Sequence, residues 1–406
     1  MKVLTPLIVL LVFCSSSFAK EDIKQLDIYI SDIKKEEFSY DYDKIEAESS
    51  KLRDSWIAPL RLNYSYSKSN PYDNEQTQQG ASIKMDQPIF QSGGIYYGIK
   101  FAEASRIYSN FSVDVAKRKL VKDAVSLLMQ IKQMSLKVQR QELQIKNSEI
   151  NLEQKKEQYL SGQLDSGFLD NAVIERNFVI QSLYDIQTNK ERLISKFQAL
   201  SDMDYKIAPI PHLELLEEDE FLKHNIVLNM SESEIEKNRY NKDVTVAKYL
   251  PRISLTAGYN WMDSDNQKFM PSQPSISTNT DYYDYGVKAY IPLDINTFRD
   301  IESSRIDYLK SKVIKQDAKI QLQALFEQVM QNIKNFDKKK LLSVENKEIY
   351  AKLLSDTKSL YEVGHKTSYD VDLLSNSVMI QEIDLNIFEI DKQLELLTLY
   401  EMYKND

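Results

Sequence analysis

Two short stretches of the sequence, YLSGQLDSGFLD at residues 159–170 and YEVGHKTSYDVD at residues 361–372, share their key positions. Tyrosine, glycine, serine and aspartate recur in both at the same internal spacing, about half the chain apart. The corresponding positions are Tyr159, Gly162, Ser166 and Asp170 in the first stretch and Tyr361, Gly364, Ser368 and Asp372 in the second. Glycine suits a helix end, where a left-handed residue is common. The recurrence therefore predicts two structural repeats, each containing one such turn.

Further landmarks recur in the same order in both halves. EASRIY at 103–108 is answered by ESSRID at 302–307, and a proline enters an alternating segment at Pro59 and again at Pro251. We therefore predict a first repeat over 20–205 and a second over 206–406. Each should contain a helix, a strand, a loop, a second strand, a long helix, the glycine turn and a final helix.

Four segments of about ten residues alternate between apolar and polar side chains. They are IAPLRLNYSY at 57–66, GASIKMDQPIF at 80–90, YLPRISLTAGY at 249–259 and YGVKAYIPLDI at 285–295. This period of two predicts strands with one apolar and one polar face, separated by polar loops near 68–80 and 263–281. The length matches a membrane β-barrel, and the tyrosines suit its interfaces. A small soluble sheet with one wet face is the alternative.

Apolar residues also recur every three or four positions, from Leu120 to Val138 and from Leu322 to Phe336. Such seams are typical of coiled-coil helices. No proline interrupts residues 98–160 or 298–363, so each run predicts one continuous helix. At ~1.5 Å per residue the first helix would be about 95 Å long. An ordinary elongated helical bundle would share this feature.

The first residues predict export. Lys2 precedes a short uncharged run that ends in Ser17, Phe18 and Ala19, which is typical of a signal peptide at 1–19. The run is shorter than the ~20 residues of a membrane-spanning helix. The only cysteine, Cys14, lies within it, so no disulfide is expected in the mature chain. The net charge of −9 disfavours nucleic acid as a partner.

Strands and helices together restrict the architecture. Four strands cannot close a barrel, so several copies must contribute to one. Two copies would give eight strands and a filled interior, whereas three would give twelve strands and leave room for a lumen. The long helices would then continue this tube below the membrane.

This plan resembles the TolC family of outer-membrane efflux proteins over essentially the whole mature chain. The resemblance depends on the duplicated order, YLPRISLTAGY, the MDQPIFQSGG stretch at 85–94, and the paired glycine turns. It implies a mostly α fold: a long α-helical coiled-coil barrel, with four strands per chain forming a trimeric 12-stranded transmembrane β-barrel. It also implies a homotrimer in outer-membrane lipid with a large periplasmic extension.

The function implied by the resemblance is passive efflux or type I secretion. Substrates would be delivered by an inner-membrane transporter through a periplasmic adaptor. The alternative is a structural or adhesive coiled-coil oligomer at the cell surface, which predicts neither the amphipathic strands nor the duplicated order.

The resemblance also implies roles for individual residues at the turns. The tips that dock the adaptor match Gly162, Ser166, Gly364 and Ser368. Asp370 matches an acidic ring that constricts the channel, with Lys366 and Tyr361 as gate residues; three close carboxylates would raise each other's pKa and attract cations. Two positions depart from the pattern, because Leu373 replaces a second acidic residue and Phe168 replaces an acidic gate partner. Asp370 could instead simply favour a helix start.

No pattern predicts catalysis. His212, His224 and His365 are too scattered to indicate a metal site, and no glycine-rich phosphate loop is present in the sequence. We therefore expect no cofactor, no metal and no enzymatic activity, which disfavours a soluble periplasmic enzyme.

Overall fold

The computed structural model describes residues 23–404, and the expected signal peptide at 1–19 lies outside them. The first half contains helix α1 (Asp32–Arg53), strands β1 (Arg61–Ser69) and β2 (Gln76–Phe90), and helices α2 (Gly94–Leu160) and α3 (Ser166–Gln198). The second contains α4 (Glu218–Lys223), α5 (Ile226–Lys248), β3 (Arg252–Gln267), β4 (Ile276–Tyr290), α6 (Thr297–Glu362) and α7 (Ser368–Tyr400). Two short 3-10 segments are η1 (Ile23–Tyr29) and η2 (Pro71–Asp73).

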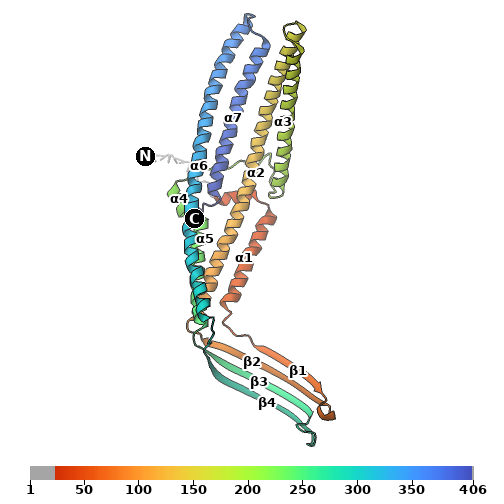
Figure 1. Ribbon diagram of the computed structural model, residues 1–406, viewed down its shortest axis with the longest axis vertical. Coiled ribbons are helices and arrows are strands. Elements are labelled where there is room, and N and C mark those ends of the chain that lie inside the picture. The colour runs from red at the N-terminus through yellow and green to blue at the C-terminus, as the bar shows by residue number, and fades with distance from the viewer. Residues whose placement is uncertain (1–22, 405–406) are drawn as a thin grey trace, which may run out of the picture.

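Two very long helices give the molecule its elongated shape, with the sheet at one end and the glycine turns at the other (Figure 1). α2 has 67 residues and α6 has 66, so each is about 100 Å long at ~1.5 Å per residue. The predicted continuous helices over 98–160 and 298–363 are thereby confirmed. No helix in the described part of the chain carries an apolar stretch sufficient to cross a membrane.

The two halves have the same order of main elements. α1, β1, β2, α2 and α3 correspond to α5, β3, β4, α6 and α7. In each half the shorter helices meet end to end at mid-height. The Ser31 N–H donates to the Leu200 carbonyl where α1 begins and α3 has ended (2.8 Å), and the Ile226 N–H donates to Met402 in the same way (2.8 Å). Two short helices thus line up against each long one.

The main apolar core lies at this mid-height junction. Its fully buried members include Leu128 of α2, Phe197 of α3 and Leu397 of α7. Phe221 of α4 stacks on Phe326 of α6 with ring centroids 5.8 Å apart. Burying one such side chain stabilises the fold by about 1.5–3 kcal/mol. The core therefore holds the helices of the two halves together, at a level between the sheet and the turns.

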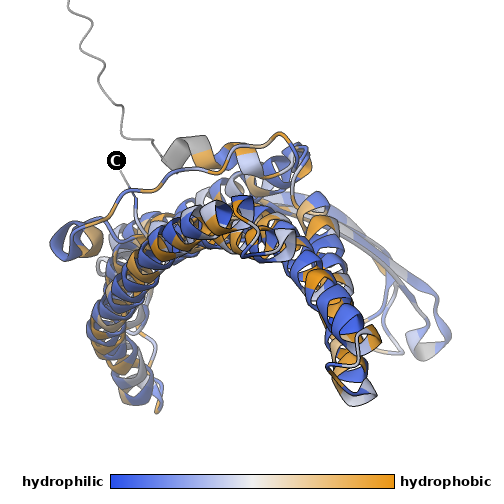
Figure 2. Ribbon diagram, turned by 90° about the horizontal axis from the view of Figure 1, so that it is seen from above, coloured by the Kyte–Doolittle hydropathy of each residue, from blue (hydrophilic) through white to orange (hydrophobic). Residues whose placement is uncertain are grey.

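The predicted helical seams coincide with this core. Ala124 and Ile131 are buried in α2, and Leu322, Val329 and Ile333 are buried in α6. The seams therefore do pack, as the three- and four-residue spacing predicted. Seen from above, the helices form one curved wall rather than a solid bundle (Figure 2). An ordinary elongated bundle is therefore excluded.

The strands form one antiparallel sheet in the order β1-β2-β3-β4, so β2 and β3 join the two halves. β2, β3 and β4 are longer than predicted, and β1 is shifted to start at Arg61. The connecting segments span only 70–75 and 268–275 rather than 68–80 and 263–281. The prediction failed there because polar residues such as Gln76 and Thr278 were interpreted as loop, although they pair with Ser69 and Ser264. The last strand ends at Tyr290, before Pro292, which cannot donate to a ladder.

Candidate functional site

The two glycine turns have the same backbone structure. Gly162 and Gly364 both adopt left-handed angles, with φ of 76° and 79°. The N–H after each glycine donates to a carbonyl five residues earlier, from Gln163 to Gln158 and from His365 to Leu360, both at 2.8 Å. This is the Schellman ending of a helix, which satisfies carbonyls that the helix leaves free. The repeated glycine is thus explained by backbone geometry.

The helix that follows each turn starts at an N-cap three residues after the glycine. Asp165 caps α3 by accepting from the Gly167 N–H at 2.8 Å. Thr367 caps α7 by accepting from the Asp370 N–H at 3.3 Å. The four positions predicted to dock an adaptor, namely Gly162, Ser166, Gly364 and Ser368, are all exposed at these turns.

Asp370 completes a capping box in the second turn. Its Oδ2 accepts from the Thr367 N–H at 3.1 Å and from the Thr367 hydroxyl at 2.9 Å. The hydrogen bond from the Thr367 backbone lowers the pKa of Asp370. In a single chain Asp370 therefore has the helix-starting role that its position also allowed. Phe168 holds the equivalent place in the first turn and is 52 % exposed.

The two other predicted gate residues flank this box. Lys366 Nζ lies 3.8 Å from Asp370 Oδ1, an exposed contact that contributes little stability. Tyr361 is exposed in the last turn of α6, and its carbonyl accepts from the Gly364 N–H at 3.0 Å. The structure thus brings Lys366 and Asp370 together, with Tyr361 on the preceding helix end.

The sequence did not reveal a polar ladder between α2 and α7, the two helices through which the hairpins meet. It begins near the turns, where the Tyr369 hydroxyl donates to Glu157 at 3.1 Å, and this bond raises the pKa of Tyr369. Further down it comprises Asn376 with Asn147 (2.7 Å), Asp384 with Arg140 (3.1 Å) and Asp391 with Gln133 (2.5 Å).

The ladder pairs recur every seven or eight residues on α7 and every seven to ten residues on α2, so they fix the register of one hairpin on the other. The partners lie more than 200 residues apart in sequence, as in the Tyr369–Glu157 pair. Polar residues are common on helices of this kind. No local pattern could therefore have identified these contacts.

The sheet has one apolar face. Register places Leu62, Ile83, Tyr259 and Tyr283 side by side across the four strands. All four are strongly exposed in the single chain, from 46 % to 76 %. Toward the hairpin ends, the Trp261 indole donates to Asn279 at 3.1 Å. Aromatic side chains with polar partners at the edge of an apolar band are typical of membrane interfaces.

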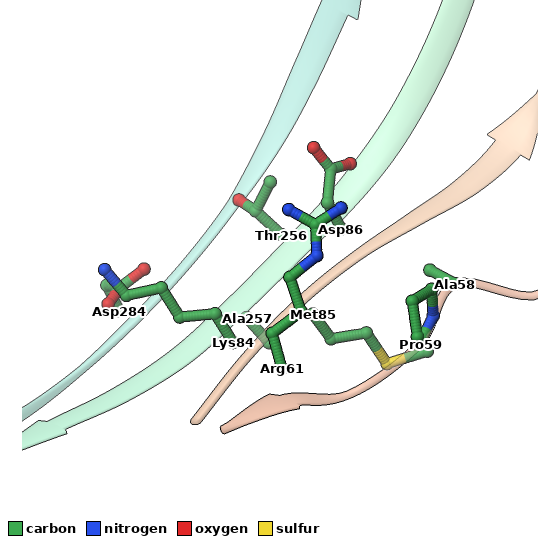
Figure 3. Close-up of a pocket in the computed structure, with 9 residues that line it drawn as sticks. All are labelled: Ala58, Pro59, Arg61, Lys84, Met85, Asp86, Thr256, Ala257 and Asp284. Carbon is green, nitrogen blue, oxygen red and sulfur yellow. The ribbon is translucent and has the colours of Figure 1, made fainter. Parts of the chain in front are cut away.

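The opposite face is polar and carries a hollow of about 420 Å³ near the helical end of the sheet (Figure 3). The lining side chains include Arg61, Lys84, Asp86, Thr256 and Asp284. This arrangement confirms the predicted alternation, since the polar positions of all four strands fall on one side. Within residues 23–404, no three histidine, cysteine or carboxylate side chains are placed to hold a metal ion.

Residues 219–402 match a family model described as outer membrane efflux protein. No curated protein matches the chain in sequence. Solved structures similar to it include the Campylobacter jejuni CmeC outer membrane channel, at 12% identity over 94% of this chain and 86% of that chain, with a TM-score of 0.70. The Vibrio cholerae outer membrane protein VceC is 14% identical over 91% and 92%, with a TM-score of 0.67. The open Neisseria gonorrhoeae MtrE outer membrane channel is 13% identical over 93% and 87%, with a TM-score of 0.61.

These matches show that the chain has the fold of outer membrane channels, which is built from long helices and a four-stranded sheet. The resemblance to the TolC family is confirmed, because residues 219–402 match the outer membrane efflux protein family and the solved structures share the fold. The predicted fold class and the outer-membrane location with a periplasmic helical extension are confirmed as well. The matched family consists of channels and indicates no enzyme.

Proposed function

We propose that three copies of this chain form a duct that passively exports substrates across the outer membrane. The observation that carries the proposal is a four-stranded sheet with two open edges, one apolar face and one polar face. In lipid, backbone groups on an open edge would lack hydrogen-bond partners, so the sheet must be completed by neighbours. A functional single copy is therefore incompatible with the strand arrangement.

Three copies place twelve strands around one axis, joined where β4 of one copy meets β1 of the next. A barrel of this size has a lumen, whereas eight strands leave an interior filled by side chains. The apolar face containing Leu62 and Tyr283 would contact lipid, and the polar face would line the pore.

The helices also carry surfaces suited to neighbouring copies. Ile306, Val313 and Ile320 recur every seven residues on α6 and are more than half exposed. Ile33 and Tyr40 are similarly exposed on α1, at the opposite side of the wall in the same half next to the sheet (Figure 1). Apolar residues at this spacing pack as coiled-coil seams. Joining α6 of one copy to α1 of the next would close the curved wall of Figure 2 into a tube.

Transport through such a duct needs energy from a partner, because the chain offers no nucleotide-binding motif in its sequence. We assign this role to an inner-membrane transporter that delivers drugs, metabolites or secreted proteins through a periplasmic adaptor. The six exposed turns of a trimer, with Gly162, Ser166, Gly364 and Ser368, are the proposed docking tips. Gly364→Pro should reduce recovery of the adaptor in a pull-down, and undiminished recovery would argue against docking there.

The same end of the tube is the proposed constriction. Threefold symmetry would bring three copies of Asp370 around the axis, with Lys366 and Tyr361 beside them, and clustered carboxylates attract cations. Asp370→Ala should then lower the cation selectivity of the pore and its block by multivalent cations. An unaltered selectivity would remove Asp370 from the constriction.

Fractionation and conductance test the main proposal. The protein should be recovered from outer membranes as a trimer that dissociates only on heating, and it should form pores in planar lipid bilayers. Recovery as a soluble monomer would refute the duct. A heat-stable membrane trimer without conductance would instead support the structural or adhesive alternative.

A further inference from the structure

The charged residues on the polar face of the sheet are confined to its helical end. Cross-strand register defines this face, because paired residues of neighbouring strands share a side. Toward the hairpin ends it carries uncharged residues such as Asn63, Ser82, Asn260 and Thr280. All its charges lie in the other half of the strands, and they are Arg61, Lys84, Asp86, Arg252, Asp284 and Lys288. We name this set the charged band.

Four cations and two carboxylates give the charged band an excess of two positive charges per chain, although the whole protein has a net charge of −9. Both carboxylates already have partners. Asp86 lies 3.9 Å from Lys288, and the Asp284 Oδ1 accepts from the Asn260 side chain at 2.7 Å. The positive excess is therefore not cancelled on this face.

Arg61 and Lys84 are the least compensated members. They lie directly opposite each other on β1 and β2, where like charges repel. Among the described residues, neither forms an ion pair within 4.0 Å of a carboxylate. Figure 3 shows the Arg61 side chain directed toward Asp86 and the Lys84 side chain directed toward Asp284, and all four residues line the hollow.

Arg252, unlike Arg61 and Lys84, is oriented by an aromatic ring rather than directed toward a carboxylate. Its guanidinium lies over the Tyr290 ring, 4.5 Å from the centroid, and register pairs the same two residues. A cation–π contact orients a guanidinium but leaves its positive charge in place. Arg61 and Lys84 line the hollow of about 420 Å³ together with Asp86 and Asp284, whereas Arg252 and Lys288 lie outside its lining.

We propose that the charged band binds anionic groups of the cargo, such as carboxylates or phosphates, as they pass from the helical tube into the barrel. The proposal rests on the trimeric duct proposed above, which turns the polar face inward and repeats the band three times. An anionic group between Arg61 and Lys84 would relieve their repulsion and accept charge-assisted hydrogen bonds. The charged band would also give the duct a cationic region at the sheet, remote from the acidic residue Asp370 at the turn.

The test uses the full-length trimer with inorganic triphosphate as the probe. In planar bilayers, triphosphate added on the barrel side should block the pore, and the double variant Arg61→Gln/Lys84→Gln should need at least about tenfold more for the same block. Lys68→Gln is the matched control, because Lys68 lies on the same strand but on the opposite face, beside Glu75. Equal block in the double variant and the wild type would overturn the proposal.

Two further readouts separate this proposal from the duct itself. Titration calorimetry with detergent-purified protein should show triphosphate binding that the double variant loses and Lys68→Gln retains, whether or not the pore conducts. A trimer that never conducts would refute the duct, and calorimetry would then decide whether the band binds anions. If Arg61→Gln alone abolished the heat-stable trimer, Arg61 would instead hold neighbouring copies together, which would refute the anion site.

Discussion

The turn at Gly364 allows a quantitative prediction, because a substitution there changes only the cost of the left-handed backbone conformation. Its φ is 79°, and a Cβ built there would meet no atom within 4 Å. Gly364→Ala therefore creates no clash and costs only the left-handed backbone, about 1–2 kcal/mol for a residue with a side chain. Gly98 is the matched control, because it lies inside α2 without a left-handed angle and also has no atom within 4 Å.

The two substitutions should have opposite effects. Gly364→Ala should destabilise the turn by about 1 kcal/mol, whereas Gly98→Ala should stabilise its helix by about 0.8–1 kcal/mol. Hydrogen exchange followed by mass spectrometry measures local opening of this kind. A change of about 1 kcal/mol corresponds to about fivefold in exchange rate. Peptides covering 358–370 should thus exchange about fivefold faster in the first variant, and peptides around Gly98 should exchange more slowly in the second.

Several results would refute this reasoning. Unchanged exchange at 358–370 in Gly364→Ala would mean that the turn relaxes to another backbone at no cost. Faster exchange in Gly98→Ala would show that open space and backbone angle do not govern the response. Gly364→Asn provides a further check, since asparagine tolerates the left-handed region and should show a smaller effect than alanine.

Three other predictions follow from contacts at the hairpins and the sheet. Asn376→Ala should cost about 0.5–1.5 kcal/mol, because it removes the hydrogen bond from the Asn376 amide to the half-buried Asn147 Oδ1. Replacing both residues by leucine should cost less, as a double-mutant cycle in thermal unfolding would show. The hydrogen bond from the Thr367 backbone lowers the pKa of the Asp370 carboxylate. Its stabilisation of the α7 start is therefore fully present at pH values above the ordinary aspartate pKa of about 3.9, and it is lost as the pH falls below that value. Protection at this turn, corrected for the intrinsic pH dependence of amide exchange, should therefore fall on acidification in the wild type and not in Asp370→Asn. Val287→Arg on the apolar face should cost about 2–4 kcal/mol in lipid and reduce trimer recovered from outer membranes, and normal recovery would place that face away from lipid.

The two long helices were predictable to within a few residues from local features. α2 and α6 contain no proline, and both end at a glycine whose conformation the turn requires. The apolar seams through Ala124 and Val329 were visible because burial repeats along a helix every three or four residues. Both kinds of information are local, and sequence records them directly.

The strand ends and the interhelical ladder were not predictable in this way. Gln76 and Thr278 are polar and lie next to turns, so only their ladder partners show them to be strand residues. Asn147 and Asn376 meet because two hairpins share a register, a relation between segments 229 residues apart. Such features depend on pairing rather than on composition, and only the folded arrangement reveals them.

Comparing the two turns shows which residues the helix reversal requires in both repeats and which residues can differ between them. Both keep the glycine, the Schellman bond and an N-cap three residues later, because a helix reversal of this form needs those elements. The third helical position is not needed for the reversal, and there the repeats differ: Phe168 is an exposed apolar ring, whereas Asp370 is a charged capping partner. Shared residues therefore explain how the chain reverses. The reversal does not require the residues that differ between equivalent positions, even though Asp370 also stabilises the start of α7. These positions are therefore where the specific chemistry of the tips must be sought.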